Sequence, residues 1–260
     1  MSSTKILEPQ MKATTINYLI EKGQLTSKDT IINEFTIGDF SRRVDLAVVA
    51  KNRLYAFEIK SESDTLSRLE GQIAKYLEYF DKVTIVAATK HIPKILRIAP
   101  KNVAIWEQKN NKVIVHQRGK IIEIMSQELL LAFMRTSDLS RIAKDLGVYN
   151  SNRSEIIYSL RELPVKKIRK TAIKSLQSKF ELTNALFWQK AEGIVKIDDL
   201  KRLSPYIEWF KRNIDPYHSG SNELVIDLIF QGKVPILETH EDKPTTSSLN
   251  QSSQSSSVSS

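Results

Sequence analysis

The sequence predicts a mixed α/β protein, with a sheet flanked by helices in its N-terminal half and a mostly α-helical C-terminal domain. Residues 44–49 and 55–60 are apolar, β-branched and aromatic runs on either side of a short polar turn, which is typical of two paired strands. Residues 82–88 form a continuous apolar run, as expected for a strand that is buried on both faces. From about Ser126 the pattern changes to that of helices.

A leader, a helix and a strand are predicted before the first of the two paired strands. Residues 1–9 are expected to be a flexible leader. Residues 11–22 carry apolar side chains at helical spacing and are followed by Gly23 in a C-cap position. Residues 30–36 are predicted to form a strand, and residues 38–39 begin a turn. The N-terminal segment therefore contributes one helix and one strand.

A helix is predicted between the second paired strand and the buried strand. Ser63 or Asp64 is a fitting N-cap, and the apolar stripe that follows ends at about Tyr79. Two strands, a helix and a further buried strand indicate a right-handed crossover within one sheet.

The end of the N-terminal domain is predicted to hold a hairpin. Residues 91–98 form a short helix or turn. Residues 102–106 and 112–117 are predicted edge strands, and the Asn110-Asn111 sequence between them is typical of a hairpin turn. We place the boundary of this domain, residues 10–120, just after the hairpin.

The C-terminal domain, residues 121–238, begins with three predicted helices, at residues 127–134, 139–146 and 154–160. The second is capped within residues 136–138 and ends at Gly147. The pattern over residues 137–160 resembles a SAP-type DNA-binding motif and, in part, a helix-turn-helix. Two helices that pack for structural reasons are the alternative.

A basic segment follows. Residues 161–180 contain seven Lys or Arg residues and one acidic residue, Glu162. Such a segment can track a phosphate backbone, although a solvated helix face is the usual meaning of a charge run. The side chains predicted to bind nucleic acid here are Lys166, Lys167, Arg169 and Lys170.

The remaining residues carry weaker signals. Residues 182–217 are predicted to be partly helical, with aromatic pairs at 187–188 and 209–210 that are expected to anchor a core. Residues 222–230 are apolar. Residues 239–260 are Ser-rich and are predicted to be disordered.

Composition narrows the class of function. The formal net charge is +9, which favours a polyanionic partner, nucleic acid more than membrane. The absence of cysteine excludes disulfides and thiolate metal sites, and the four dispersed histidines show no zinc spacing. No signal peptide or membrane span is recognisable, so we expect a cytoplasmic protein. Phosphate-loop, nucleophile-elbow and dinucleotide motifs are absent as well.

Charged residues within the two paired strands indicate a site. Glu58 and Lys60 project from one face of the second strand, and Asp45 can reach the same end of the sheet. Two carboxylates and an ammonium beside an apolar core are costly unless a cation or mutual pairing compensates them. Asp45, Glu58 and the carbonyl of Ile59 are oxygen ligands of the kind that Mg²⁺ prefers. An ion pair across a strand face is the alternative.

These residues also resemble a known family. Asp45, twelve intervening residues and then Glu58-Ile59-Lys60 resemble the core of the PD-(D/E)XK nuclease superfamily, although Val44 stands where the motif name has proline. Residues 72–76 fit the Q-x-x-x-Y element of the branch that contains phage λ-type exonucleases and RecB-type nuclease domains. The wider run over residues 32–83 looks like a poorly characterised bacterial and phage family of that superfamily.

The resemblance implies a restriction-endonuclease-like fold and a Mg²⁺-dependent deoxyribonuclease, with Mn²⁺ as a substitute metal. Gln72 and Tyr76 would order the site or contact substrate, and Glu34 would assist a metal. Three cations near the site would contact nucleic acid, namely Arg42, Arg43 and Arg68.

The resulting hypothesis is a metal-dependent nuclease acting on DNA in repair, recombination, phage replication or defence. One alternative is a DNA-binding or interaction protein that keeps the fold without cutting, and another is an adaptor whose basic surface meets protein or RNA. DNA is the expected partner, a homo-oligomer or protein partner is left open, and no membrane partner is expected.

Overall fold

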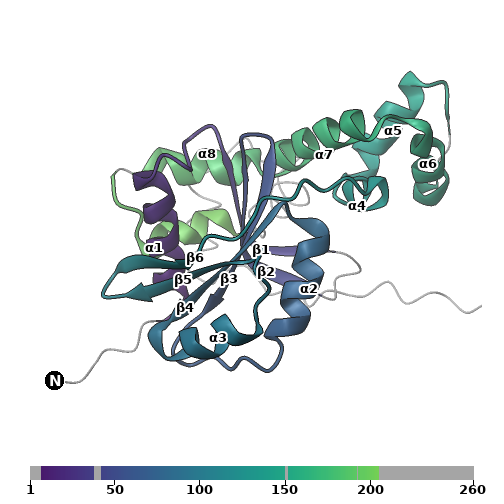
Figure 1. Ribbon diagram of the computed structural model, residues 1–260. Coiled ribbons are helices and arrows are strands. Elements are labelled where there is room, and N and C mark those ends of the chain that lie inside the picture. Colours follow the sequence, from purple (N-terminus) through teal and green to yellow (C-terminus); the bar gives the residue numbers. More distant parts are fainter. Residues whose placement is uncertain (1–6, 38–41, 150–151, 192, 205–260) are drawn as a thin grey trace, which may run out of the picture.

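The computed structural model describes residues 7–37, 42–149, 152–191 and 193–204. Within these ranges the chain forms one six-stranded sheet with the strands in sequence order (Figure 1). The pairs β3–β4 and β4–β5 are parallel, and the other neighbouring pairs are antiparallel. The strands are β1 (Thr30–Ile37), β2 (Arg42–Ala50), β3 (Arg53–Lys60), β4 (Lys82–Ala88), β5 (Ala104–Lys109) and β6 (Lys112–Gln117).

Helices cover the sheet and extend beyond it. In Figure 1, α4, α5 and α6 gather at the far end of α7, whereas α8 lies near the sheet. The helices are α1 (Glu8–Glu21), α2 (Leu69–Tyr79), α3 (Ile92–Ile98), α4 (Gln127–Ala132), α5 (Thr136–Asp145), α6 (Arg153–Ser159), α7 (Val165–Lys179) and α8 (Glu181–Lys190), with short 3₁₀ turns η1 (Thr89–His91), η2 (Leu160–Glu162) and η3 (Ile197–Leu203). The predicted fold class, a mixed α/β sheet followed by a helical region, is confirmed.

Side chains alternate across the strands and so build a core on each face of the sheet. On β3, Ala56 belongs to one core, which α2 to α7 share, and Phe57 belongs to the other, which α1, α8 and η3 share. The helices beyond residue 121 therefore contribute to both cores, and the predicted boundary near residue 121 does not separate two independent cores. Phe187 of the predicted aromatic pair is fully buried in the second core.

Two tight turns agree with the sequence. Lys51 and Asn52 join β2 to β3 with φ of 50° and 60°, and Asn110 and Asn111 join β5 to β6 with φ of 51° and 57°. Two successive residues with positive φ are the signature of a type I′ turn, whose twist matches that of a hairpin.

Several predicted boundaries were wrong. Helix α1 already includes Glu8 and Pro9, which were assigned to the leader, because proline is well tolerated in a first helical turn. Helix α2 begins at Leu69, since the Asp64 carboxylate accepts hydrogen bonds from the backbone and hydroxyl of Ser61 at 2.7 and 2.6 Å. Residues 136–138 lie inside the first turn of α5.

One predicted edge strand is in fact interior, because β5 lies between β4 and β6. The predictions for residues 38–39, 209–210, 222–230 and 239–260 lie outside the described residues. The predicted helix pair in residues 137–160 is present as α5 and α6, with Gly147 in the left-handed region at φ 76°.

Arg169 has a structural role that its sequence context does not suggest. Its side chain is 2% exposed, and its guanidinium pairs with Asp81 at 2.6 Å and with Glu123 at 2.9 Å. It also donates to the carbonyls of Asn52 and Ile124 at 3.0 and 3.2 Å. The Arg169 guanidinium therefore binds α7 to residues next to the sheet. Because its side chain is buried by these contacts, the prediction that it contacts nucleic acid is wrong.

We expect Arg169→Met to lower the free energy of unfolding by about 3–5 kcal/mol, because it leaves the buried carboxylate of Asp81 without its cation. Urea denaturation measures this change. Lys170→Met, one residue along on the exposed face of α7, is the matched control and should shift stability by less than about 0.5 kcal/mol. Equal losses in the two variants would contradict this role of Arg169.

Candidate active site at the ends of β2 and β3

The candidate site begins where β2 and β3 separate. Their pairing ends at Leu46 and Phe57, one residue before Asp45 and Glu58 would meet. Beyond that pair, the Asp45 carboxylate accepts a hydrogen bond from the backbone N–H of Ile59 at 2.7 Å. A side chain thus replaces the backbone acceptor that a continued ladder would supply, and it holds Asp45 beside Glu58.

Glu58 is the centre of the site. Its side chain is 1% exposed, and the Lys60 ammonium lies 2.5 Å from Oε1. From α2, the Gln72 amide donates to the same oxygen at 2.6 Å, and the Tyr76 hydroxyl lies 2.9 Å from Oε2. Gln72 and Tyr76 reach the same carboxylate because residues four apart share a helix face.

Tyr76 also ties the site to β2. Its hydroxyl lies 2.8 Å from the backbone carbonyl of Arg43 as well as near Glu58, so two acceptors share one proton. The ring is buried, and this burial together with the nearby charge of Glu58 raises the pKa of the Tyr76 phenol. Tyr76 therefore acts here as a hydrogen-bond donor.

Asp45 carries unusual electrostatics. Burial, followed by the nearby charge of Glu58, raises the pKa of Asp45 to about 7, although the hydrogen bond from Ile59 opposes this rise. Two carboxylates at a low-dielectric position repel each other unless a proton or a cation intervenes. The site is consequently short of positive charge at Asp45, even though Lys60 compensates Glu58.

Glu34 lies next to this pair but faces other partners. Its carboxylate pairs with Lys12 at 2.7 Å and with Arg43 at 2.8 Å. Its backbone has φ of 58°, a left-handed conformation that is rare for a residue inside a strand and costs about 1–3 kcal/mol. These ion pairs accompany a local break in the β1–β2 ladder, whose register otherwise continues through Asn33 and Phe35.

Sequence reasoning missed Lys12 and Glu8. Lys12 is 4% exposed, and besides Glu34 it contacts Glu8 at 2.8 Å and the Asn33 amide oxygen at 3.0 Å. Burial alone would lower the pKa of Lys12, but the hydrogen bonds from its ammonium to Glu34 and Glu8 raise it. A signal was available, because Lys12 is the one basic residue of α1 and lies four residues before the buried Ile16.

The fit to a divalent metal can be judged from the donors present. Among the described residues, no three acidic or histidine side chains converge as a metal site. Asp45 and Glu58 are two suitable oxygen donors. The Ile59 carbonyl points toward the same side of β3 as its N–H, because both groups of one residue face the same neighbour. The Gln72 side-chain carbonyl oxygen is buried and has no hydrogen-bond partner, so an acceptor beside Glu58 lacks a donor or a cation.

The predicted nucleic-acid contacts are dispersed. Arg42 is half-buried, and its guanidinium lies close to Gly71 of α2, whereas Arg43 and Arg68 are exposed. Lys166, Lys167 and Lys170 are exposed on α7. The cations thus lie on three separate elements: Arg42 and Arg43 on β2, Arg68 just before α2, and the lysines on α7.

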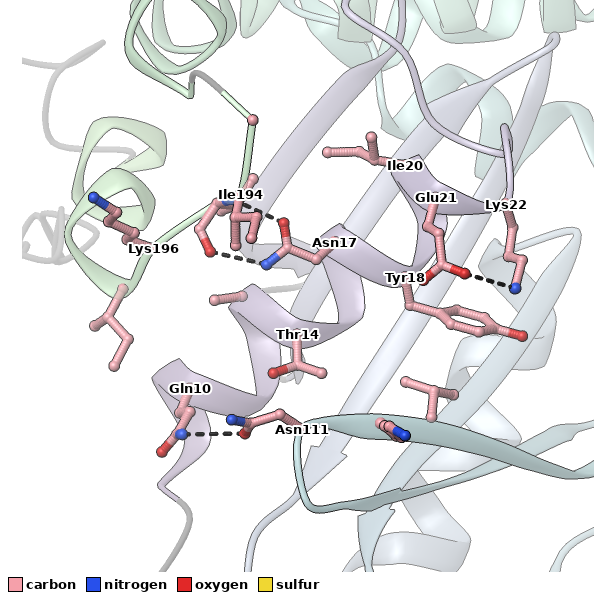
Figure 2. Close-up of a pocket in the computed structure, with 16 residues that line it drawn as sticks. Gln10, Thr14, Asn17, Tyr18, Ile20, Glu21, Lys22, Asn111, Ile194 and Lys196 are labelled. Atoms are coloured by element: carbon pink, nitrogen blue, oxygen red, sulfur yellow. Dashed lines mark hydrogen bonds and ion pairs between the residues drawn. The ribbon is translucent and has the colours of Figure 1, made fainter.

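A large cavity lies elsewhere. It measures about 1020 Å³ and is bounded by α1, the tip of the β5–β6 hairpin and residues 193–197 (Figure 2). Asn17 on its wall exchanges two hydrogen bonds with the backbone of Val195, at 2.8 and 2.9 Å. None of the predicted site residues lines this cavity, so we base the functional argument on the buried carboxylates.

Comparison with known proteins decides the family. Residues 1–204 match the family described as bacteriophage P4 protein cII. The chain belongs to the P4 cII family. Protein cII of Enterobacteria phage P4 is 34% identical over 208 residues, which cover 76% of this chain and 77% of the phage protein.

Among solved structures, a protein of unknown function from Silicibacter pomeroyi matches 54% of this cII-family chain and 92% of its own length, with 16% identity and a TM-score of 0.37. Across the described residues, no helix has the length and apolar character that crossing a bilayer would require.

The raised pKa of Asp45 predicts a pH dependence of stability. The folded pKa of about 7 exceeds the ordinary value of 3.8, so between these pH values the folded state holds a proton that the unfolded state has lost. Relative to Asp45→Asn, the wild-type free energy of unfolding should therefore fall as pH rises from about 4 to about 7, and then level off.

Denaturation in EDTA at a series of pH values measures this difference, and exposed Glu70→Gln on α2 is the control. A wild-type curve parallel to that of Asp45→Asn across this pH range would show that the pKa of Asp45 is not raised.

Proposed function

We propose that this P4 cII-family protein is a Mg²⁺-dependent nuclease that hydrolyses phosphodiester bonds in DNA. The observation that carries the proposal is the hydrogen bond from Ile59 N–H to Asp45. It holds a second, half-buried carboxylate next to Glu58, with Lys60 at the same strand end. Asp45, Glu58 and Lys60 carry the sequence resemblance to PD-(D/E)XK nucleases, and their closeness at this strand end supports the proposal.

Asp45, Glu58 and the Ile59 carbonyl would hold the metal. When bound, Mg²⁺ supplies a Lewis acid that lowers the pKa of a coordinated water and offsets charge on the scissile phosphate. Gln72 and Tyr76 orient the Glu58 carboxylate through hydrogen bonds from one face of α2. The Lys60 ammonium, which pairs with Glu58, would offset negative charge that develops on the phosphate.

The choice of DNA as substrate rests on charge. The chain has a net charge of +9, exposed Arg43 lies on β2 two residues before Asp45, and exposed Arg68 precedes α2, the helix that carries Gln72 and Tyr76. Exposed lysines on α7 offer a further surface for a phosphate backbone. DNA is consistent with a family named after a phage protein, while the pathway in which it would be cut stays open.

A second candidate is a DNA-binding protein that does not cut. Two observations favour it: Lys60 already pairs with Glu58, and Glu34 is engaged by Lys12 and Arg43. In such a protein the buried charges would neutralise one another and serve only the fold. Cleavage assays distinguish the two functions.

Cleavage of labelled single-stranded, duplex and branched DNA tests the nuclease proposal directly. We expect Mg²⁺- or Mn²⁺-dependent products that EDTA abolishes. Asp45→Asn, Glu58→Gln and Lys60→Ala should each reduce the cleavage rate by roughly 100-fold or more, because the first two weaken a proposed metal ligand and the third removes the ammonium that would offset charge on the phosphate.

Glu70→Gln, an exposed carboxylate on α2, is the matched control and should cut at the wild-type rate. Circular dichroism of each variant checks that the fold persists. Cleavage by Asp45→Asn at the wild-type rate would refute the proposed site. Metal-independent DNA binding with no cleavage of any substrate would favour the second candidate.

The lysines of α7 predict a salt dependence of DNA binding. Each of Lys166→Ala, Lys167→Ala and Lys170→Ala should weaken binding to all sequences alike and reduce the slope of log affinity against log salt by about 1. Fluorescence anisotropy at several salt concentrations measures the slope. Lys28→Ala, an exposed lysine between α1 and β1, is the control. An unchanged slope in the three α7 variants would remove α7 from the DNA interface.

A further inference from the structure

The outer side of β6 is an open sheet edge. This strand ends the sheet, and within the described residues no other strand pairs with its outer side. Two of its apolar side chains are exposed, Ile114 at 45% and Val115 at 39%. An unpaired, apolar edge strand presents a row of free N–H and C=O groups that another strand can join. The edge thus has the features of a pairing surface.

The opposite edge of the sheet, at β1, is covered by a side chain, unlike the edge at β6. At β1, the side-chain amide of Asn184 from α8 accepts from Ile31 N–H at 2.7 Å and donates to the Ile31 carbonyl at 2.9 Å. One amide therefore occupies the backbone groups that a further strand would use. Covering of this kind is how soluble proteins prevent edge pairing. In the described part of the chain, β6 has no equivalent cover.

The hairpin geometry shows which groups of β6 face outward. In a two-residue type I′ hairpin, the residues flanking the turn, here Lys109 and Lys112, exchange backbone hydrogen bonds. Hydrogen-bonded residues alternate along an antiparallel pair, so Ile114 also faces β5. The N–H and C=O groups of Val113 and Val115 consequently point away from the sheet.

We propose that β6 pairs in antiparallel fashion with β6 of a second copy of this chain, with the two-fold axis at Ile114. In this register Val113 lies opposite Val115 of the partner subunit, and each such pair exchanges both backbone hydrogen bonds. Ile114 lies opposite its own counterpart in the partner, at a non-hydrogen-bonded position where side chains are close. The outward-facing groups of each strand therefore meet one another.

The charges along β6 favour a second copy in this register. Lys112 would lie opposite His116 of the partner subunit, at the point where the β5–β6 register shifts and skips His116, and within each chain His116 bonds Glu107 at 2.7 Å. The ammonium of Lys112 would then lie near the His116–Glu107 pair of the partner subunit, in which Glu107 supplies a negative charge. Parallel pairing in register would instead set Lys112 beside another Lys112. One edge pairing is a small interface, so the dimer should be weak and depend on concentration.

Single cysteines test the register, because the chain has none of its own. Diamide oxidises two thiols to one disulfide, taking up the two electrons and two protons that they lose. Ile114→Cys should form a dimer of twice 29.7 kDa on a non-reducing gel. The expected Cα separation at this position, about 4.5 Å, lies within the range that a disulfide spans.

Val115→Cys is the matched control, since it is similarly exposed but faces Val113 of the partner subunit on the opposite face of the sheet. Tyr158→Cys, which is 69% exposed on α6, controls for random collision. Both should remain monomeric at the same diamide concentration. Equal cross-linking of all three variants, or none in Ile114→Cys, would overturn the proposal.

Sedimentation velocity of the full chain provides a second test. The wild type should shift from monomer toward dimer as concentration rises. Ile114→Lys should remain monomeric, because two lysines would face each other on the axis. Tyr158→Lys should behave as wild type. A wild type that stays monomeric throughout, or an Ile114→Lys variant that still dimerises, would show that β6 is not the contact.

Discussion

The candidate site depends on one buried carboxylate, that of Glu58. A charge at 1% exposure is stable only if hydrogen bonds and a counter-charge replace the water it has lost. The surrounding elements meet this need: Lys60 comes from the same strand, and Gln72 and Tyr76 come from α2. The same contacts fix the position of α2 against β3, so the site and the packing of this layer stabilise each other.

A second buried carboxylate, that of Asp81, connects the sheet to the helical region. Asp81 precedes β4, and its carboxylate accepts from the backbone N–H groups of Leu54 and Ile124 as well as from Arg169. Asp81 therefore connects strand β3, the segment after the β5–β6 hairpin and helix α7. These contacts hold the helical region against the sheet, in line with the cores that the two share. The edge at β1 is closed by Asn184, whereas β6 relies on solvent or a partner.

Local patterns predicted most of the fold. Paired asparagines at positive φ specified the β5–β6 turn, and the alternation around Phe57 specified a two-sided strand. Contacts between distant residues were not predictable. Arg169 resembles its lysine neighbours in sequence, and only the approach of Asp81, 88 positions away, distinguishes it. Helix α2 began later than predicted because the Asp64 carboxylate binds back to Ser61 rather than capping the helix.

In the candidate site, too, residues marked by local sequence patterns were predicted and residues brought in by distant contacts were not. Asp45, Glu58 and Lys60 could be named from charges within the paired strands, and Gln72 and Tyr76 from the resemblance to a Q-x-x-x-Y element; the structure brings all five together. Lys12 and Glu8 were missed because they belong to a helix on the other face of the sheet, and Lys12, which Glu8 pairs with, reaches Glu34 only through the fold.

Glu34 shows how these two groups of residues can be coupled. Its carboxylate is held by Lys12 and Arg43, its backbone is strained, and it lies opposite Asp45 in the β1–β2 register. If a metal is bound as proposed, its charge would favour the ionised form of Asp45, whose pKa is raised by burial and by Glu58. Glu34 is already held by Lys12 and Arg43, so a site that also used Glu34 as a ligand would first have to break these two ion pairs.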